Sequence, residues 1–244
     1  MTTSSPALEV NIEGKQYGDG RPVLSDVRFD VAAGEIVAVI GKSGSGKTTL
    51  LRILAGLDCD YEGSVLINRL PVRGASRQCG VVFQDSRLLP WFTVLQNVIF
   101  ALPENVVSKG AVALAALETV DMAAAQALLP SQLSGGMEKR VALARAIAHP
   151  PRLLLLDEPF TAIDHTSRGA LQEAVYRIHS GNNLTTIIVT HDLDEAVYLS
   201  DRVLLIGGAP TTLLSEHRIS APRPRERNST EAISIKQALI GELT

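Results

Sequence analysis

The fold of this chain is decided by one stretch, Ile36-Val-Ala-Val-Ile-Gly41-Lys-Ser-Gly-Ser-Gly46-Lys47-Thr48-Thr49-Leu50. A short β-branched apolar run ends in a glycine-rich turn, and a helix-forming run over 50–55 follows it. The turn fits the pattern G-x-x-x-x-G-K-[ST] of phosphate-binding loops, which lie between a strand and a helix. The stretch therefore predicts a site for a nucleoside triphosphate. The alternative is a glycine turn that binds nothing.

The loop carries the groups that a triphosphate needs. Its glycines let the backbone curl with the N–H groups pointing inward, and the next helix presents its positive end to the same place. Lys47 is positioned to reach the β- and γ-phosphates, and the hydroxyl of Thr48 is positioned for Mg²⁺. We expect the nucleotide to be held by Gly41, Lys42, Ser43, Gly44, Ser45, Gly46, Lys47, Thr48 and Thr49.

Composition and charge narrow the class of protein. The chain has 244 residues, of which 45% are hydrophobic and 20% charged, enough for one large globular domain. A net charge of −3 gives no general reason to expect a nucleic-acid partner. No secretory signal is visible at the N-terminus, and no apolar run approaches the ~20 residues of a membrane helix. We expect a cytosolic chain that reaches a membrane only through a partner.

The order of the predicted elements indicates an α/β fold. Apolar and polar residues alternate over 8–12 and 26–31, as in antiparallel strands with one solvated face. From 152 onward strands and helices alternate, which favours a parallel sheet. Between them, about 87–148, helical spacing and scattered prolines indicate an inserted helical subdomain. A C-terminal extension, about 209–244, includes a basic, proline-broken segment that we expect to be exposed before a short final helix.

Two adjacent carboxylates end one of these strands. The run of four leucines before Asp157, Glu158 and Pro159 is typical of a strand buried on both faces. Ligands bind at the carboxyl ends of strands in open α/β sheets. In a protein with a phosphate-binding loop, Asp157 would belong to the Mg²⁺ shell and Glu158 could polarise the attacking water.

A resemblance to a known family rests on these motifs together with Gln132-Leu133-Ser134-Gly135-Gly136-Met137, which runs into Arg140-Val-Ala-Leu-Ala-Arg145. This segment resembles the signature of ABC-type ATPases, and all the motifs follow in the family's order. The resemblance implies a P-loop ATPase fold with a mostly parallel core sheet, an antiparallel β subdomain and an inserted α-helical subdomain. It also implies a head-to-tail dimer with two ATPs held between the P-loop of one copy and the signature of the other.

The resemblance assigns further positions one at a time. Tyr17 matches the aromatic that stacks on adenine, and Gln84 matches the glutamine that senses Mg²⁺ and the attacking water. Asp164 matches the aspartate loop at the dimer interface, and His191 matches the histidine that contacts the γ-phosphate. The catalytic set would be Lys47, Gln84, Glu158 and His191. The metal set would be Thr48, Gln84 and Asp157, and the nucleotide would also contact Tyr17, Ser134, Gly135, Gly136 and Asp164.

Some positions depart from the family's pattern. Glu138 and Lys139 stand where Arg-Gln is common, Ile163 replaces the usual leucine, and Thr161 stands where glycine or serine is commoner. None of these changes removes a functional group, so we expect activity to survive. The acidic Glu138 near a phosphate-binding helix start is expected to weaken the ATP sandwich.

A narrower resemblance involves the segment from Val82 to Trp91, the segment 194–199 and the Pro222-Arg-Pro-Arg225 tail. It is similar to the ATPase subunits of nitrate, sulfonate and taurine importers. The resemblance implies a homodimer on two permease subunits, a separate solute-binding protein, and Trp91 and Arg87 near the permease. The alternative interpretations are that Trp91 packs within the inserted helical subdomain and that Arg87 is simply solvated. A non-transport ABC ATPase, acting in repair, translation or assembly, and a regulatory subunit that binds nucleotide without hydrolysis also stay open.

Overall fold

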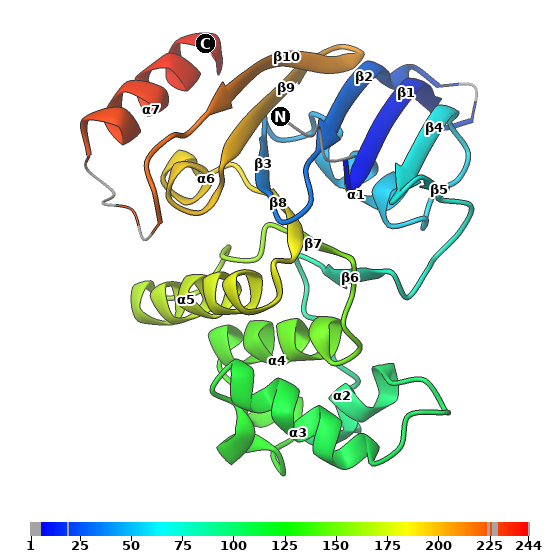
Figure 1. The fold of residues 1–244 in the computed structure, drawn as a ribbon, viewed down its shortest axis with the longest axis vertical. Helices are drawn as coiled ribbons and strands as arrows, with labels where there is room; N and C mark the ends of the chain where they lie inside the picture. The colour runs from blue at the N-terminus through cyan, green and yellow to red at the C-terminus, as the bar shows by residue number, and fades with distance from the viewer. Residues whose placement is uncertain (1–5, 19, 224, 226–228, 244) are drawn as a thin grey trace. The chain divides into compact units, whose positions relative to one another are not determined.

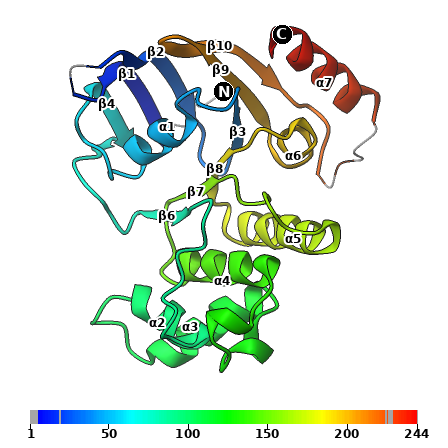
Figure 2. The ribbon, with the colours of Figure 1, turned by 180° about the vertical axis from the view of Figure 1, so that it is seen from behind.

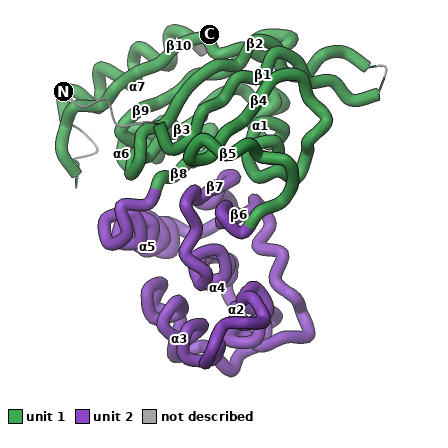
Figure 3. The backbone as a smooth tube through the Cα atoms, turned by 45° about the vertical axis from the view of Figure 1, so that its right-hand side comes forward, with its two compact units in different colours: residues 1–76, 185–244 green, residues 77–184 purple. Residues whose placement is uncertain are grey.

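The computed structural model describes residues 6–18, 20–223, 225 and 229–243. They form two compact units (Figure 3): unit 1 contains 1–76 and 185–244, and unit 2 contains 77–184. None of the helices in this described part is long and apolar enough to cross a bilayer.

Unit 1 is built on a mixed sheet (Figure 1), whose strand order is β5-β4-β1-β2-β10-β9-β3-β8. The strands β9, β3 and β8 run parallel, whereas β1 pairs antiparallel with both β2 and β4. Its elements are β1 (Leu8–Gln16), β2 (Pro22–Val31), β3 (Ile36–Ile40), α1 (Lys47–Leu54), β4 (Glu62–Ile67), β5 (Leu70–Pro71), β8 (Thr185–Val189), α6 (Leu193–Leu199), β9 (Arg202–Gly208), β10 (Thr211–Arg218) and α7 (Thr230–Leu243).

The burial of these strands follows their sequence patterns. All five residues of β3 and all five of β8 are buried, as expected for continuous apolar runs inside a sheet. In β2, buried and more exposed residues alternate along much of the strand. The expected α/β class with an antiparallel β part is confirmed.

The C-terminal part is more ordered than the sequence indicates. Strand β10 pairs antiparallel with β9, and α7 is a helix of 14 residues rather than a short one. Helices α6 and α7 lie side by side (Figure 2) and share an apolar core with the sheet, to which α7 contributes Ala232 and Leu239. The sequence did not predict β10, because the residues of this strand alternate only weakly between buried and exposed.

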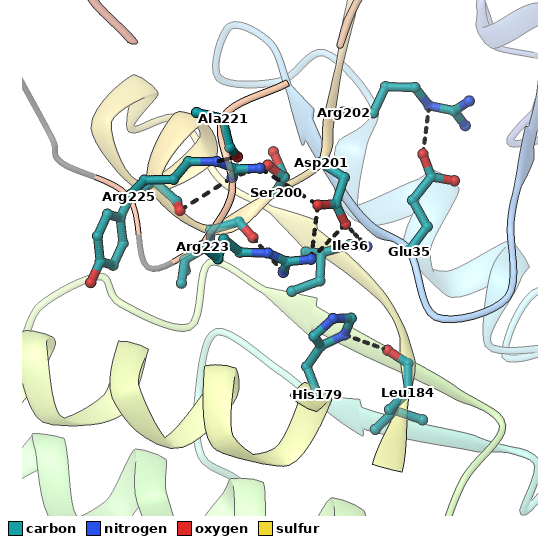
Figure 4. Close-up of polar contacts among 12 residues, drawn as sticks. Glu35, Ile36, His179, Leu184, Ser200, Asp201, Arg202, Ala221, Arg223 and Arg225 are labelled. Carbon is teal, nitrogen blue, oxygen red and sulfur yellow. Dashed lines mark hydrogen bonds and ion pairs between the residues drawn. The ribbon is translucent and has the colours of Figure 1, made fainter. Parts of the chain in front are cut away.

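Two arginines of the basic segment before α7, Arg223 and Arg225, are not exposed as expected. Arg223 donates two 2.8 Å hydrogen bonds to the carboxylate of Asp201, and Arg225, which is 8% exposed, lies within 3.5 Å of the same group (Figure 4). Arg225 also donates to the carbonyls of Val197, Tyr198 and Ser200. The arginines thus satisfy carbonyls at the end of α6, which a helix terminus leaves without partners. Arg227 lies outside the described residues.

Replacing Arg225 with alanine is expected to lower the free energy of unfolding by about 2–4 kcal/mol, because it strips buried carbonyls of a charged donor. Arg218→Ala provides the matched control, since the Arg218 side chain is 74% exposed, and should change stability by less than about 0.5 kcal/mol. Urea unfolding followed by circular dichroism measures both. Equal stability of the two variants would mean that the segment is not held by Arg225.

Unit 2 contains two parallel strands and the helices of the inserted helical subdomain. Val82 of β6 pairs with Leu156 of β7, and all five residues of β7 are buried. Its elements are β6 (Cys79–Val82), α2 (Val94–Ala101), α3 (Lys109–Thr119), the 3-10 turns Ala123–Ala125 and Pro130–Gln132, α4 (Gly135–Ile147), β7 (Leu153–Asp157) and α5 (His165–Asn182).

The helical spacing of the sequence continues over 111–127, but α3 ends at Thr119. Asp121 has a φ of 57°, which an α-helix does not tolerate, and its carboxylate lies 2.6 Å from the Arg177 guanidinium of α5. The hydrogen bonds and charge of Arg177 hold the pKa of Asp121 below its ordinary value. The helix therefore ends beside the Asp121–Arg177 ion pair, although the helical spacing of the sequence continues beyond that point.

Candidate functional site

The phosphate-binding loop joins β3 to α1 in unit 1. Gly46, the residue before α1, has a φ of 72°, and a Cβ at this position would lie 2.9 Å from Leu24. Glycine is therefore required for both reasons. Lys47 is 6% exposed, and its ammonium donates to the carbonyls of Gly41 at 2.9 Å and Lys42 at 3.0 Å. The lysine head thus lies inside the curl of the loop.

Two observations show that the loop fits an anion. The hydroxyl oxygen of Ser45 is buried and has no hydrogen-bond partner among the described residues. Helix α1 has no side-chain cap and no acidic residue in its first turn, so no carboxylate of its own first turn competes for its leading N–H groups. A phosphate would accept hydrogen bonds from such donors at the positive end of the helix.

The structure brings His191 to the same edge of the sheet as the loop. Val39 of β3 pairs in parallel with Val189 of β8, and Thr190 donates its backbone N–H to the Val39 carbonyl. Gly41 and His191 each follow these strand ends by one or two residues, and the His191 side chain is exposed. Asp192 caps α6 by accepting from the N–H groups of Asp194 and Glu195, which fixes the backbone beside His191.

Tyr17 follows β1 and is linked to the helix after the loop. Its hydroxyl lies 3.1 Å from a carboxylate oxygen of Asp58 and 3.5 Å from the hydroxyl of Thr49 on α1. Its side chain remains 49% exposed. Within unit 1, the structure thus brings together Tyr17 and the P-loop helix.

The remaining predicted site residues belong to unit 2. Because Val82 pairs with Leu156 in parallel, Gln84 and the Asp157–Glu158 pair follow adjacent strand ends. Asp157 is buried, whereas Gln84 is exposed. Glu158 has a φ of 44°, and one of its carboxylate oxygens accepts a 3.2 Å hydrogen bond from the hydroxyl of Thr161. A left-handed glutamate is a strained conformation of the kind found at functional sites.

The signature segment and the aspartate loop are neighbours in unit 2. Ser134 caps α4 by accepting from the Met137 N–H, and Asp164 caps α5 by accepting from the Ser167 N–H. A Cβ on Gly136 would lie only 2.4 Å from the Cβ of Ser167, so only glycine allows the two helix starts to approach. The exposed start of α4 offers N–H groups at its positive end.

The atypical residues after the signature both contact the segment that follows β6. Glu138 accepts a 2.8 Å hydrogen bond from the hydroxyl of Ser86, and Lys139 donates to the Gln84 carbonyl. Lys139 is buried, and burial lowers its pKa despite the nearby carboxylates of Asp85 and Asp157. Glu138 is therefore engaged within unit 2. The predicted weakening of the ATP sandwich stays a prediction.

Sequence reasoning missed several residues that contact the predicted site. Lys15 and Asp58 contact Tyr17, and Ser86 and Lys139 contact the signature helix or the Gln84 segment. No spacing rule links these partners, since Lys15 and Asp58 stand 43 positions apart. Only Lys139 carried a signal, as a departure from the family's pattern.

Comparisons with known proteins agree with this geometry. The model of the ABC transporter family matches residues 24–161. The aliphatic sulfonates import ATP-binding protein SsuB 1 of Xanthomonas axonopodis pv. citri is 48% identical over 239 residues, covering 96% of this chain and 94% of that protein. SsuB of Bacillus licheniformis is 42% identical, with coverage of 97% and 94%. The ATP-binding cassette MJ0796, solved as a dimer with ADP and phosphate, superposes with a TM-score of 0.77 at 27% identity, covering 88% of this chain and 99% of that chain.

The chain belongs to the ABC transporter family, as one of its ATP-binding cassettes. It is an ATPase, and its substrate is ATP.

Proposed function

We propose that the chain is the ATP-hydrolysing subunit of an importer for small anionic solutes of the sulfonate, nitrate or taurine type. Its relatives at 42–48% identity are named as aliphatic sulfonate import proteins, and the similarity covers almost the whole of each chain. The solute passes through a separate permease and is delivered by a separate solute-binding protein. The chain itself lies at the cytoplasmic face of the inner membrane, bound to the permease.

The observation that carries the permease contact is an aromatic patch on unit 2, formed by Trp91, Phe92 and Phe100. Trp91 is 69% exposed and Phe100 is 66% exposed, and both rings pack against Phe92. Large exposed aromatics mark sites of protein–protein contact. Packing within the lobe, the alternative for Trp91, does not account for this exposure. Arg87, which lies over the Phe83 ring, supplies a cation nearby in the sequence.

Each site residue has a role that its chemistry supports. Lys47 neutralises the β- and γ-phosphates, and the loop N–H groups hold their oxygens. Glu158 orients the attacking water and removes its proton, with Thr161 holding the carboxylate. His191 and Gln84 contact the γ-phosphate and the water, and Tyr17 stacks on adenine. Mg²⁺ bound through the oxygens of Thr48, Gln84 and Asp157 would neutralise charge on the transferred phosphoryl group, and these are the hard donors that Mg²⁺ prefers.

A second copy of the chain completes each nucleotide site. Ser134 caps the start of α4, where Ser134 and Gly135 are exposed and Gly136 is buried, and Asp164 caps the neighbouring helix α5. An exposed helix start with N–H donors suits the γ-phosphate held by the partner's P-loop. The dimeric state of MJ0796 supports this arrangement.

The test is a pull-down from detergent-solubilised membranes of the host, with tagged protein as bait. The wild-type chain should retain a polytopic membrane protein. Trp91→Ala combined with Phe100→Ala should reduce its recovery about tenfold or more, because buried aromatic anchors dominate interface energies. Leu70→Ala is the matched control, since Leu70 is 58% exposed but lies in unit 1.

Recovery of only soluble partners, or of nucleic acid, would favour a non-transport ABC ATPase. Equal recovery by the aromatic double variant and the wild type would leave the importer assignment standing and remove the aromatic patch from the permease contact. The retained permease then leads to the solute, through transport assays with sulfonates, taurine and nitrate.

A further inference from the structure

The exposed ring of Tyr17 is held by a buried ion pair in unit 1. Lys15, which is only 3% exposed, places its ammonium 2.9 Å from a carboxylate oxygen of Asp58 and 4.4 Å from the centroid of the Tyr17 ring. The second oxygen of Asp58 lies 3.1 Å from the Tyr17 hydroxyl. Two side chains at the end of β1 and one from the segment after α1 therefore form one closed set of contacts.

The geometry gives the two faces of the ring different surroundings. The ammonium lies over one face, where it is attracted by the ring's negative quadrupole. A base cannot stack on that face without displacing a buried cation. The hydroxyl, bonded to Asp58 and close to Thr49, stops the ring from swinging on its Cα–Cβ bond.

The ion pair is shielded from water and is supported by a further hydrogen bond. The Asp58 side chain is 10% exposed, so the pair lies largely out of water and is weakly screened. Lys15 also donates to the backbone carbonyl of Asp60, in the segment before β4. Burial opposes both charges, yet hydrogen bonding and attraction raise the pKa of Lys15 and lower that of Asp58. Both groups stay charged near neutral pH.

We infer that Lys15 and Asp58 are positioning residues for the nucleotide base: Lys15 covers one face of Tyr17, Asp58 anchors its hydroxyl, and the opposite face is thereby presented to adenine. This inference rests on the proposed stacking role of Tyr17. It assigns to Lys15 and Asp58 a contribution to base binding that leaves the phosphate contacts unchanged.

The test separates the two halves of the nucleotide. We define the base factor as the dissociation constant of inorganic tripolyphosphate divided by that of ATP, both measured by calorimetry on the full chain with Mg²⁺. Lys15→Met should weaken ATP about 5- to 20-fold and change tripolyphosphate less than about twofold, because a lost cation–π contact frees the ring to move. Lys15→Arg, which keeps the cation, should restore most of the base factor.

Two further variants keep the test decisive if Lys15→Met folds poorly. Tyr17→Phe keeps the ring and removes the bond to Asp58, and Asp58→Asn removes the charge that holds Lys15, so each should lower the base factor about 3- to 10-fold. Arg28→Gln is the matched control, because it removes an exposed cation of β2 that is paired with Asp26. It should leave the base factor unchanged.

Equal weakening of ATP and tripolyphosphate by Lys15→Met would show that Lys15 supports the whole site rather than the base, and would overturn the inference. An unchanged base factor in all three variants would do the same. A wild-type chain that hydrolyses ATP but has a base factor near one would remove the stacking role of Tyr17, and the inference with it, while leaving the ATPase in place. A wild-type chain that neither binds nor hydrolyses ATP would instead contradict the proposed function.

Discussion

Replacing Glu158 with glutamine is expected to lower the ATP turnover number by about 10²–10⁴-fold, the range for loss of a general base. Glu158 directly follows the fully buried strand β7, its carboxylate is held by the Thr161 hydroxyl, and its backbone is in a strained left-handed conformation. Glutamine keeps the size of the side chain but cannot take a proton from water. ATP should therefore still bind while hydrolysis stops.

Phosphate release from purified protein measures the effect, with Glu118→Gln as the matched control in the same unit. Glu118 is exposed on α3, and its replacement should leave turnover within about twofold of wild type. The variant that retains ATP should also accumulate as a dimer in size-exclusion chromatography, because the nucleotide is not consumed. Turnover near the wild-type rate in Glu158→Gln would refute the assignment of Glu158 as the base.

Replacing Lys47 with alanine acts one step earlier, on nucleotide binding. We expect the dissociation constant for ATP to rise about 30- to 1,000-fold, the equivalent of about 2–4 kcal/mol, because the triphosphate loses the buried cation that neutralises it. In the structure this ammonium lies within the loop and donates to two of its carbonyls, so it is already aimed at the position of the anion. Titration with a fluorescent ATP analogue gives the constant directly.

Lys109→Ala serves as the matched control, since Lys109 begins α3 in unit 2 and belongs to none of the predicted sites. Circular dichroism of Lys47→Ala must match the wild type, because the side chain also bonds the loop backbone. Unchanged ATP affinity in a folded Lys47→Ala protein would mean that the loop N–H groups alone hold the triphosphate. The two variants together distinguish binding from chemistry: Lys47→Ala loses the nucleotide, whereas Glu158→Gln retains it unhydrolysed.

The segment before α7 is part of the folded unit rather than a tail. Arg223 and Arg225 do not form a solvated basic tail, since they close the end of α6 and pair with Asp201. Helix α6 begins two residues after His191, so the segment stabilises the element that directly follows this histidine and its cap Asp192. The Arg225→Ala variant therefore tests the stability of the helix beside His191 as well as that of the C-terminal segment.

The sequence by itself determined the elements that rest on local patterns. The P-loop and the buried strands β3 and β7 were predicted close to their observed bounds, because apolar runs and glycine act over a few positions. The family motifs supplied Tyr17, Gln84, Ser134, Asp157, Glu158, Asp164 and His191 as site residues. Their roles remain predictions that the variants above can test.

Only the tertiary structure decided which distant side chains meet. The Lys15–Asp58 pair, the Arg225 contacts with α6, the pairing of β10 with β9 and the exposure of Trp91 all depend on the faces that the folded elements present to one another. From the sequence alone, a charged residue is expected to be solvated unless its partner is known. The partners of Lys15, Arg223 and Arg225 stand 22 to 43 positions away. Burial and pairing are properties of the packed chain, which is why local patterns could not predict them.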